Sequence, residues 1–534
     1  MKKIVSLVLL LCFMATLFVG CSSNSNTKQS TKTTEQAKIT EVKTVDLSEK
    51  IKFSMALPEV LPEYVNSKDA IYKKIQEKLN IEIEPIAVTW DDYKDKLKLW
   101  AASGELPDVC LIDNAGTALF KSWIDNGVVK EIPKDMSQYP NIAKSFDAPD
   151  VQALKINDKF YFVPRSNYQS RPTDTAASNV IFYRKDWAQK LSLKEPQTVE
   201  EFTAFVKAMV NGNPEGDNRK ITGITMYYTV NLNSLTFPFC PMDGSGWIKD
   251  EDGNVKPAFF TKPYVDGLKY LRKLYDEKLL DQDFAIQKSD DGMQKFANGK
   301  SAVVLWQLTG AFDMMNTLGS GLEKMYPGKK AIDMIGIIKP LNNVKDGKKY
   351  TTFGNSFWSE TYINANTDDK KTDRILRFLD YTVSDEFVEM TRYGIDGVDF
   401  TKEGDKYTIT RAKDKDGKYE DLKTKYKFLP GNLFAAQWFT DVNPNDPTFP
   451  QELNDTVSGL KDWAAKNATF ITPNFKAAFD TNEKKSILNS IQDNFINIIV
   501  SKEDVQKMYD KSVEDYKANG LDKLIDEVNT AIAK

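Results

Sequence analysis

The most informative absence in this 534-residue sequence is histidine, which does not occur at all. A chain without histidine cannot perform Ser-His-Asp or Cys-His catalysis, and it cannot build the His-containing zinc sites common in metallohydrolases. Carboxylate, Lys, Tyr or Ser-Lys chemistry remains open, but no pair stands out among 76 Asp and Glu residues. The composition thus excludes histidine-dependent enzymes and singles out no catalytic pair.

Cysteine is also scarce, with four residues in the whole chain. Cys12 lies inside an N-terminal hydrophobic run and Cys21 follows that run, so only Cys110 and Cys240 belong to the remaining chain. A disulfide between these two is an open alternative in an exported protein. Cys110 lies within the apolar run DVCLI, however, and this context favours a small buried side chain.

An excess of positive charge is missing as well. The chain has 72 Lys and Arg against 76 Asp and Glu, and removing Lys2 and Lys3 with the N-terminal run leaves 70 against 76, a net charge of about −6. Nucleic-acid binding has a basic footprint, so we predict no nucleic-acid partner. The length beyond the N-terminal region suits two or three domains.

The N-terminus has the layout of a secretory signal. Two lysines precede a nearly uncharged run at 4–19, which is short for a membrane span, and Gly20-Cys21 follows it. The junction resembles a bacterial lipobox, although Phe18 stands where Leu is commonest. We predict a signal peptide at 1–20, a diacylated Cys21 and a disordered polar tether at 21–48, which would hold the protein on the extracellular face of the membrane. An ordinary signal peptide or membrane anchor is the alternative.

The rest of the chain alternates between strand and helix patterns. Strand, helix, strand, helix and strand follow one another at 51–57, 68–80, 81–88, 90–104 and 107–113, which is the order of a mainly parallel sheet covered by helices. A second unit predicts further strands and helices. Its extended segments are 160–165, 179–187, 300–306 and 361–366, and its helices lie within 196–210, 261–280, 368–384, 482–500, 501–520 and 521–528.

Seven segments in this order resemble the family-1 sugar-binding extracellular solute-binding proteins of ABC transporters, particularly the LplA/LipO-type lipoproteins of Gram-positive bacteria. They are LKLWAASGELPDV, YFVPR, FYRKDWAQKL, PQTVEEFTAFVKAM, GWIKDEDGNVKPAF, YVDGLKYLRKLYDEKLLD and YGIDGVDFT. The resemblance implies a two-lobed, type II binding-protein fold, with a mainly parallel sheet in each lobe and the ligand held between the lobes. It places lobe 1 at 49–168 and 360–440, and lobe 2 at 169–359 and 441–534.

The same resemblance implies a function and partners. We expect a non-enzymatic component of an importer that captures an oligosaccharide and passes it to the transmembrane permease subunits. A carboxylate-based glycoside hydrolase and a peptide-binding or sensory lipoprotein are the alternatives. The sequence leaves open whether the ligand is neutral or acidic.

Sugar sites combine stacking aromatic rings with planar hydrogen-bonding groups, so we expect both near the predicted cleft. Asp113 and Asn114 follow a buried strand, where sheets of this kind bind ligands, although they also suit a turn or helix cap. The resemblance adds residues near the cleft or its crossing segments, each with packing or an ion pair as the alternative. They are Trp90, Arg165, Tyr168, Trp306 and Trp358.

One loop resembles the EF-hand-like calcium loop of related proteins. Asn213, Glu215 and Asp217 occupy alternate positions and Arg219 offers a carbonyl, but the later acidic ligands are missing and the loop is one residue short. The prediction is no required cofactor, with a structural calcium ion and a solvated turn as the two alternatives for this loop.

Overall fold

The computed structural model describes residues 46–533 apart from short stretches, and Leu47–Lys534 form one compact unit. The stretches left out are 59–61, 66–67, 90–91, 168–178, 213, 218, 243–245, 251–252, 308–317, 353–355, 414–418, 429–445, 472–486 and 488–489. No helix in the described part of the chain has both the length and the apolar character needed to cross a membrane.

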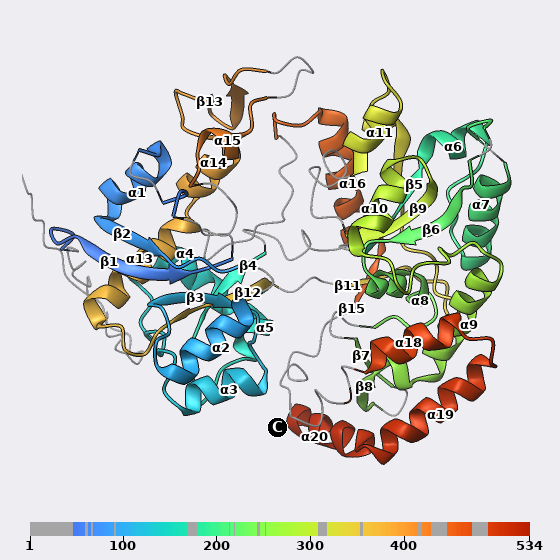
Figure 1. The fold of residues 1–534 in the computed structure, drawn as a ribbon, viewed down its shortest axis with the longest axis horizontal. Coiled ribbons are helices and arrows are strands. Elements are labelled where there is room, and N and C mark those ends of the chain that lie inside the picture. Colours follow the sequence, from blue (N-terminus) through green and yellow to red (C-terminus); the bar gives the residue numbers. More distant parts are fainter. Residues whose placement is uncertain are drawn as a thin grey trace, which may run out of the picture. The chain divides into compact units, whose positions relative to one another are not determined.

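The first sheet has five strands in the order β2-β1-β3-β12-β4 (Figure 1). β1 pairs in parallel with β2 and β3, whereas β12 runs antiparallel to both of its neighbours. The chain returns to this sheet at β12 after building the second sheet, so no helical crossover forces that strand to run parallel. The strands are β1 (Ile51–Ala56), β2 (Ile81–Pro85), β3 (Val109–Ile112), β4 (Val163–Ser166) and β12 (Phe357–Ile363).

Local sequence explains the helices that connect these strands. Asp69 caps α1 (Ala70–Leu79) by accepting the backbone N–H groups of Ile71 and Tyr72, and Gly104 ends α2 (Tyr93–Ser103) in the left-handed conformation. The apolar stripe of α1 packs into a core that also contains residues of α13 (Asp369–Thr382). This core consists of residues from 53–163 and 362–428.

The second sheet has four strands in the order β10-β5-β9-β6. β6 is parallel to β9, and β5 is antiparallel to both β9 and β10. β5 is the first strand that the chain forms after it leaves the first sheet. In each sheet, therefore, the antiparallel strand is the one by which the chain arrives from the other sheet. The strands are β5 (Asn179–Arg184), β6 (Thr222–Met226), β9 (Ser301–Gln307) and β10 (Ile335–Ile338).

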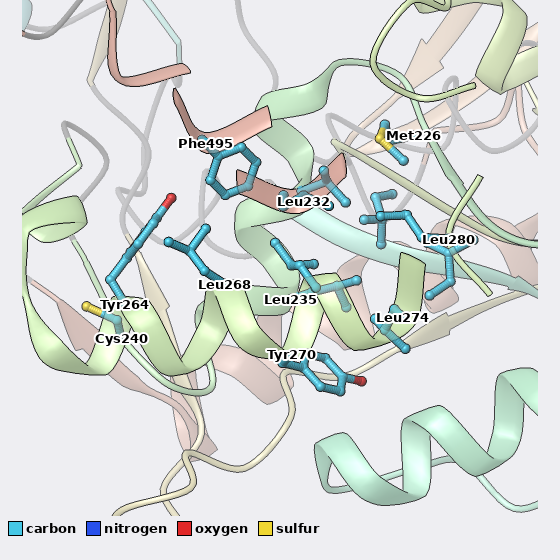
Figure 2. Packing of buried hydrophobic residues seen from close by; sticks show 14 of the residues in the cluster. Met226, Leu232, Leu235, Cys240, Tyr264, Leu268, Tyr270, Leu274, Leu280 and Phe495 are labelled. Atoms are coloured by element: carbon cyan, nitrogen blue, oxygen red, sulfur yellow. The ribbon is translucent and has the colours of Figure 1, made fainter. Parts of the chain in front are cut away.

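The core of the second lobe surrounds α9 (Lys262–Asp276), whose apolar face meets the C-terminal helices. Figure 2 shows Leu268 and Tyr264 of α9 beside Phe495, with Cys240 next to Tyr264. The remaining core helices are α7 (Val199–Asn211), α18 (Ile491–Val500), α19 (Val505–Ala518) and α20 (Leu521–Ala533). A further cluster on the same sheet contains residues from 180–335 and 453–460.

Further elements complete the two lobes. The helices are α3 (Ala118–Asp125), α4 (Pro140–Ala143), η1 (Lys144–Asp147), α5 (Pro149–Gln152), α6 (Lys185–Lys190), η3 (Thr229–Leu232), α8 (Asn233–Thr236), η4 (Ala258–Phe260), α10 (Ser289–Ala297), α11 (Ser320–Met325), α12 (Ala331–Met334), α14 (Asp385–Tyr393), α15 (Leu422–Lys425) and α16 (Gln451–Asn467). The strands are β7 (Trp247–Lys249), β8 (Val255–Pro257), β11 (Tyr350–Thr352), β13 (Phe400–Glu403), β14 (Lys406–Ile409) and β15 (Thr469–Ile471).

The structure confirms the predicted α/β class and corrects one segment. Residues 179–187 are not extended throughout, because β5 ends at Arg184 and α6 begins at Lys185. The Asp186 carboxylate lies in the first turn of α6, where it accepts the backbone N–H of Trp187, and it also pairs with the Arg184 guanidinium. The lobe boundaries remain predictions.

The two cysteines are free and buried in different cores, Cys110 in the first lobe and Cys240 in the second. Burial raises the pKa of both thiols, and that of Cys240 reaches about 11. Both cysteines are therefore small core side chains, as the context of Cys110 predicted.

Candidate functional site

Two predicted residues lie at the carboxyl end of β3. Asp113 accepts a hydrogen bond from the Tyr93 hydroxyl at 2.7 Å and pairs with the Lys94 ammonium at 2.9 Å. Asn114 is buried, and its Oδ1 accepts the Tyr362 hydroxyl at 2.5 Å. Thr117, rather than either of these residues, caps α3. The end of β3 therefore positions one partly exposed carboxylate above a buried amide.

Sequence reasoning missed a third polar residue at this position, Glu360 of β12. Its Oε2 accepts the backbone N–H groups of Asn114 at 2.8 Å and Ala115 at 3.1 Å. Burial raises the pKa of Glu360 to about 8 despite these hydrogen bonds. The available signal was one carboxylate in the otherwise uncharged strand FWSETYI. Burial thus favours the neutral acid at Glu360, whereas the two backbone N–H groups favour the carboxylate.

Arg165 of β4 and Trp358 of β12 lie together, on the two strands by which the chain leaves the first sheet and returns to it. The Arg165 guanidinium lies 5.3 Å from the Trp358 ring centroid and is fully buried, and burial lowers the pKa of Arg165 to about 9. Trp358 is 38% exposed. The β12 register shifts at this point, and Ser359 adopts a left-handed φ of 64°. At this bulge the Trp358 ring is thus partly exposed and lies within cation–π distance of the Arg165 guanidinium.

Trp306 lies next to the last residue of β9 and packs inside the second lobe. Its ring lies 6.3 Å from Phe182 and 5.9 Å from Tyr227, and only 6% of the residue is exposed. Its buried indole N–H lacks a hydrogen-bond partner among the described residues. Tyr228, which stacks edge-on against Tyr227 at 4.2 Å, is the exposed aromatic residue at this edge. Ligand contact by Trp306 remains a prediction.

A pocket of about 230 Å³ lies at the same edge of the second sheet, and no sequence pattern indicated it. Val180 and Ile181 of β5 line it beside the ends of β9 and β10, because Val180 pairs with Trp306 and Ile181 with Ile338. None of the sixteen lining residues carries a charge. The polar ones are Asn233, Ser234, Asn343, Tyr350 and Thr352.

The predicted calcium loop follows α7 and is held by cations of the chain itself. Glu215 accepts hydrogen bonds from the buried Arg184 guanidinium at 3.2 Å and from the Trp187 indole. Asp217 pairs with Arg219 at 2.6 Å, and the Lys190 ammonium donates to the carbonyl of Pro214. No group of three acidic or cysteine side chains suited to a metal gathers within the described residues. These oxygen atoms already have donors, so they do not fit a calcium ligand set.

Some predicted site residues lie outside the described part of the chain. They are Cys21, Trp90, Tyr168 and Asn213. Of the others, the structure brings Asp113 and Asn114 together at one strand end, and Arg165 and Trp358 together at the β12 bulge. Trp306 lies in the other lobe, among its core residues.

Two sheets, each with its own hydrophobic core, form the two-lobed fold of a solute-binding protein. Comparison with known families agrees, because the model of the bacterial extracellular solute-binding proteins matches residues 70–398. The chain belongs to this family.

Curated relatives match nearly the whole chain. It is 25% identical over 485 residues to the polygalacturonan/rhamnogalacturonan-binding protein YtcQ of Bacillus subtilis (strain 168), covering 87% of this chain and 88% of that protein. It is 24% identical to lipoprotein LipO of the same organism, covering 88% of this chain and 90% of the other.

Solved structures show the same fold. The alginate-binding protein AlgQ2 without calcium ion has a TM-score of 0.67 at 20% identity and covers 91% of this chain and 99% of its own. The Streptococcus pneumoniae substrate-binding protein FusA in complex with kestose has a TM-score of 0.66 at 16% identity, again covering 91% and 99%.

Proposed function

We propose that this protein captures an oligosaccharide outside the cell and delivers it to the permease of an ABC importer, without chemistry on the sugar. Membership of the extracellular solute-binding family is the observation that carries this proposal. The names of relatives and of proteins with the same fold support the ligand class, since they bind polygalacturonan, rhamnogalacturonan, kestose or alginate.

The geometry of the first lobe suits a sugar. Trp358 offers a half-open indole face for the apolar side of a ring, and Asp113 offers a partly exposed carboxylate at the end of the adjacent strand β3. A stacking ring beside hydrogen-bonding groups is the combination that sugar recognition needs.

Thermal unfolding of the mature chain tests the proposal. We would use the chain from residue 21 with Cys21→Ser, which stays unlipidated, and titrate neutral and uronate oligosaccharides of several lengths. A ligand at about 100 times its Kd adds roughly 2.7 kcal/mol to the free energy of unfolding. A dose-dependent rise in melting temperature with the glycan recovered intact supports a binding protein. Cleaved glycan would support the hydrolase alternative, and no shift with any glycan contradicts the sugar proposal.

We further propose that Cys21 carries the lipid anchor that keeps the protein at the outer face of the membrane. The lipobox-like junction and a relative named a lipoprotein support this. In cells that make the full-length chain, Cys21→Ser should move the protein from the membrane fraction to the medium. Retention of the variant in the membrane would contradict lipid anchoring at this residue.

A further inference from the structure

The uncharged pocket of the second lobe restricts what the proposed site can hold. We infer that this pocket receives one neutral sugar ring with an apolar substituent, such as a methyl or acetyl group, and excludes a uronate. The inference rests on the proposed function and names the ligand class at one position of that site.

The place of the pocket connects it with ligand binding. The start of β5 lines the pocket beside the carboxyl end of β10, and in sheets of this class ligands bind outside the carboxyl ends of the strands. Its volume of about 230 Å³ is just below the roughly 300–1,000 Å³ of sites for drug-sized ligands. The pocket thus suits a single ring rather than a chain.

The charge of the lining argues against an acidic ring. All sixteen lining residues are uncharged, and the Lys349 ammonium next to the wall already donates to the carbonyl of Pro340 at 2.6 Å. A carboxylate in this pocket would therefore lose water without gaining a free cation from the lining residues. Such an unpaired buried charge costs several kcal/mol. A neutral ring carries no such cost.

The polar groups of the pocket are mostly engaged. Asn343 donates to the carbonyl of Pro238 at 2.8 Å, and the Tyr350 hydroxyl donates to Asp346 at 2.7 Å. The Ser234 hydroxyl is buried without a hydrogen-bond partner among the described residues. Its oxygen has almost no solvent-accessible surface, so it offers no hydrogen bond to a ligand in the pocket. A pocket whose polar groups are engaged or covered, with apolar residues such as Phe237 in its lining, matches a ring that carries an apolar substituent.

A charge placed in the wall tests this inference. Val230 lines the pocket and is 52% exposed, so Val230→Lys should fold, and Ile286→Lys is the matched control because Ile286 is 86% exposed and does not line the pocket. Calorimetry would compare neutral oligosaccharides that end in a 6-deoxyhexose or an N-acetylhexosamine with oligouronates of equal length. We expect the wild type to bind the neutral set at least tenfold more tightly, and Val230→Lys alone to narrow that ratio.

Ser234→Ala is a second control. It removes a buried hydroxyl without a partner among the described residues, so the melting temperature of the free protein should be equal or higher and the affinity for the neutral ligand should be unchanged. If no glycan binds, the proposed function fails. If uronates bind as tightly as neutral sugars, or if Val230→Lys and Ile286→Lys behave alike, the pocket inference fails while the function stands.

The loop after α7 carries a second, independent inference. A protein with this fold has been solved as an EF-hand mutant, and another without its calcium ion, so the fold family implies calcium. We propose that in this chain Arg184, Lys190 and Arg219 take the place of the calcium ion and that the loop binds none.

Each of these cations satisfies an oxygen in the loop 213–219 or joins it to the lobe. Besides Asp217, Arg219 reaches the carbonyl of Gly299 at 3.2 Å and the Tyr326 hydroxyl at 3.1 Å. Burial raises the pKa of Glu215, but hydrogen bonds from Tyr326 and Trp187 and the Arg184 charge outweigh it, so the pKa is lowered. Glu215 is therefore ionised with its counter-charge already in place.

Terbium luminescence tests this directly, because an ion bound at Glu215 would lie beside the Trp187 indole that donates to it. Excitation of tryptophan in the unlipidated mature chain should give no saturable terbium emission, and the melting temperature should be equal in EDTA and in millimolar calcium. Saturable emission that calcium displaces, or a melting temperature that rises with calcium, would overturn the proposal.

The network itself needs a matched variant. Arg219→Gln should lower the melting temperature more than Lys207→Gln, since Lys207 forms a single exposed pair with Glu277 at 2.8 Å in the same lobe. Equal falls in melting temperature would show that Arg219 does not hold the loop. If calcium restores the melting temperature of Arg219→Gln, the proposal stands only when calcium leaves that of the wild type unchanged.

Discussion

The carboxyl edges of the two sheets differ in where they place charge and where they place tryptophan. The first sheet holds buried Glu360 and Arg165 beside a half-open Trp358, whereas the second holds a buried Trp306 beside an uncharged pocket. One edge thus combines buried charged groups with a partly exposed indole, and the other combines a buried indole with an uncharged pocket.

The difference extends to the backbone. β12 of the first sheet changes register between Phe357 and Glu360, and Ser359 within it has a left-handed φ of 64°. The strands β5 and β9 of the second sheet pair without a shift from Asn179 to Tyr183. Irregular backbone therefore accompanies the exposed tryptophan, and regular pairing accompanies the buried one.

The largest effect should come from Trp306. Trp306→Ala leaves a cavity among Phe182, Tyr227 and their neighbours, so we expect the free energy of unfolding to fall by about 3–5 kcal/mol. Urea denaturation measures it, with Trp306→Phe as the smaller change. An alanine variant of unchanged stability that binds sugar poorly would reverse the comparison and make Trp306 a ligand contact.

Glu360 should give the second largest effect, and one that depends on pH. Its folded pKa of about 8 exceeds the usual 4.5, so the unfolded state releases this proton first and stability is lost as pH rises from about 4.5 to 8. Glu360→Gln keeps an oxygen for the backbone donors and removes the charge. We expect it to gain about 4 kcal/mol relative to the wild type between pH 5 and 8.5, measured by urea denaturation.

Asp108→Asn is the control of opposite sign. Burial raises the pKa of Asp108, but hydrogen bonds from Ser54 and Lys371 outweigh it and lower the pKa. Its stabilising effect is present at neutral pH and is lost as pH falls through the folded pKa, so Asp108→Asn should destabilise at pH 7 and much less in acid. If the free energies of unfolding of Glu360→Gln and the wild type change in parallel with pH, Glu360 does not have the raised pKa assigned to it.

Local pattern was enough to predict β1, α1, β2, α2 and β3, because each has its own apolar period, cap or stop residue within the segment. It also located Asp113 and Asn114, since polar residues directly followed a buried strand. Trp358 and Arg165 came from the resemblance to a family rather than from any period.

What was missed depends on contacts between distant segments. The buried Glu360 carboxylate accepts a hydrogen bond from a backbone N–H that lies 246 residues away in the sequence. No local pattern indicates such a contact. The pocket combines residues of β5, α8, β10, β11 and α16. The calcium loop was left open because its acidic spacing is local, whereas Arg184, which satisfies Glu215, lies 31 residues earlier.

Trp358 should affect binding, in contrast to Trp306. Trp358→Ala removes a stacking ring of a residue that is 38% exposed, so we expect sugar affinity to fall about 30-fold, or about 2 kcal/mol, and the free energy of unfolding to fall by less than in Trp306→Ala, where the residue is 6% exposed. Calorimetry and urea denaturation measure the two. Leu99→Ala on α2, 67% exposed, is the control. A variant that binds normally would remove Trp358 from the site.

The smallest effect concerns Ser359, the residue with left-handed backbone that directly follows Trp358 in β12. A left-handed φ costs a non-glycine residue about 1 kcal/mol, so Ser359→Gly should raise the free energy of unfolding by up to about that amount. Loss of the hydrogen bond that the Ser359 hydroxyl donates to the Trp358 carbonyl reduces this gain. Ser359→Ala keeps the strain and loses the hydroxyl, so it should be less stable than the glycine variant. If the alanine variant is the more stable of the two, the bulge is not strained, and the contrast with the regular second sheet then rests on register alone.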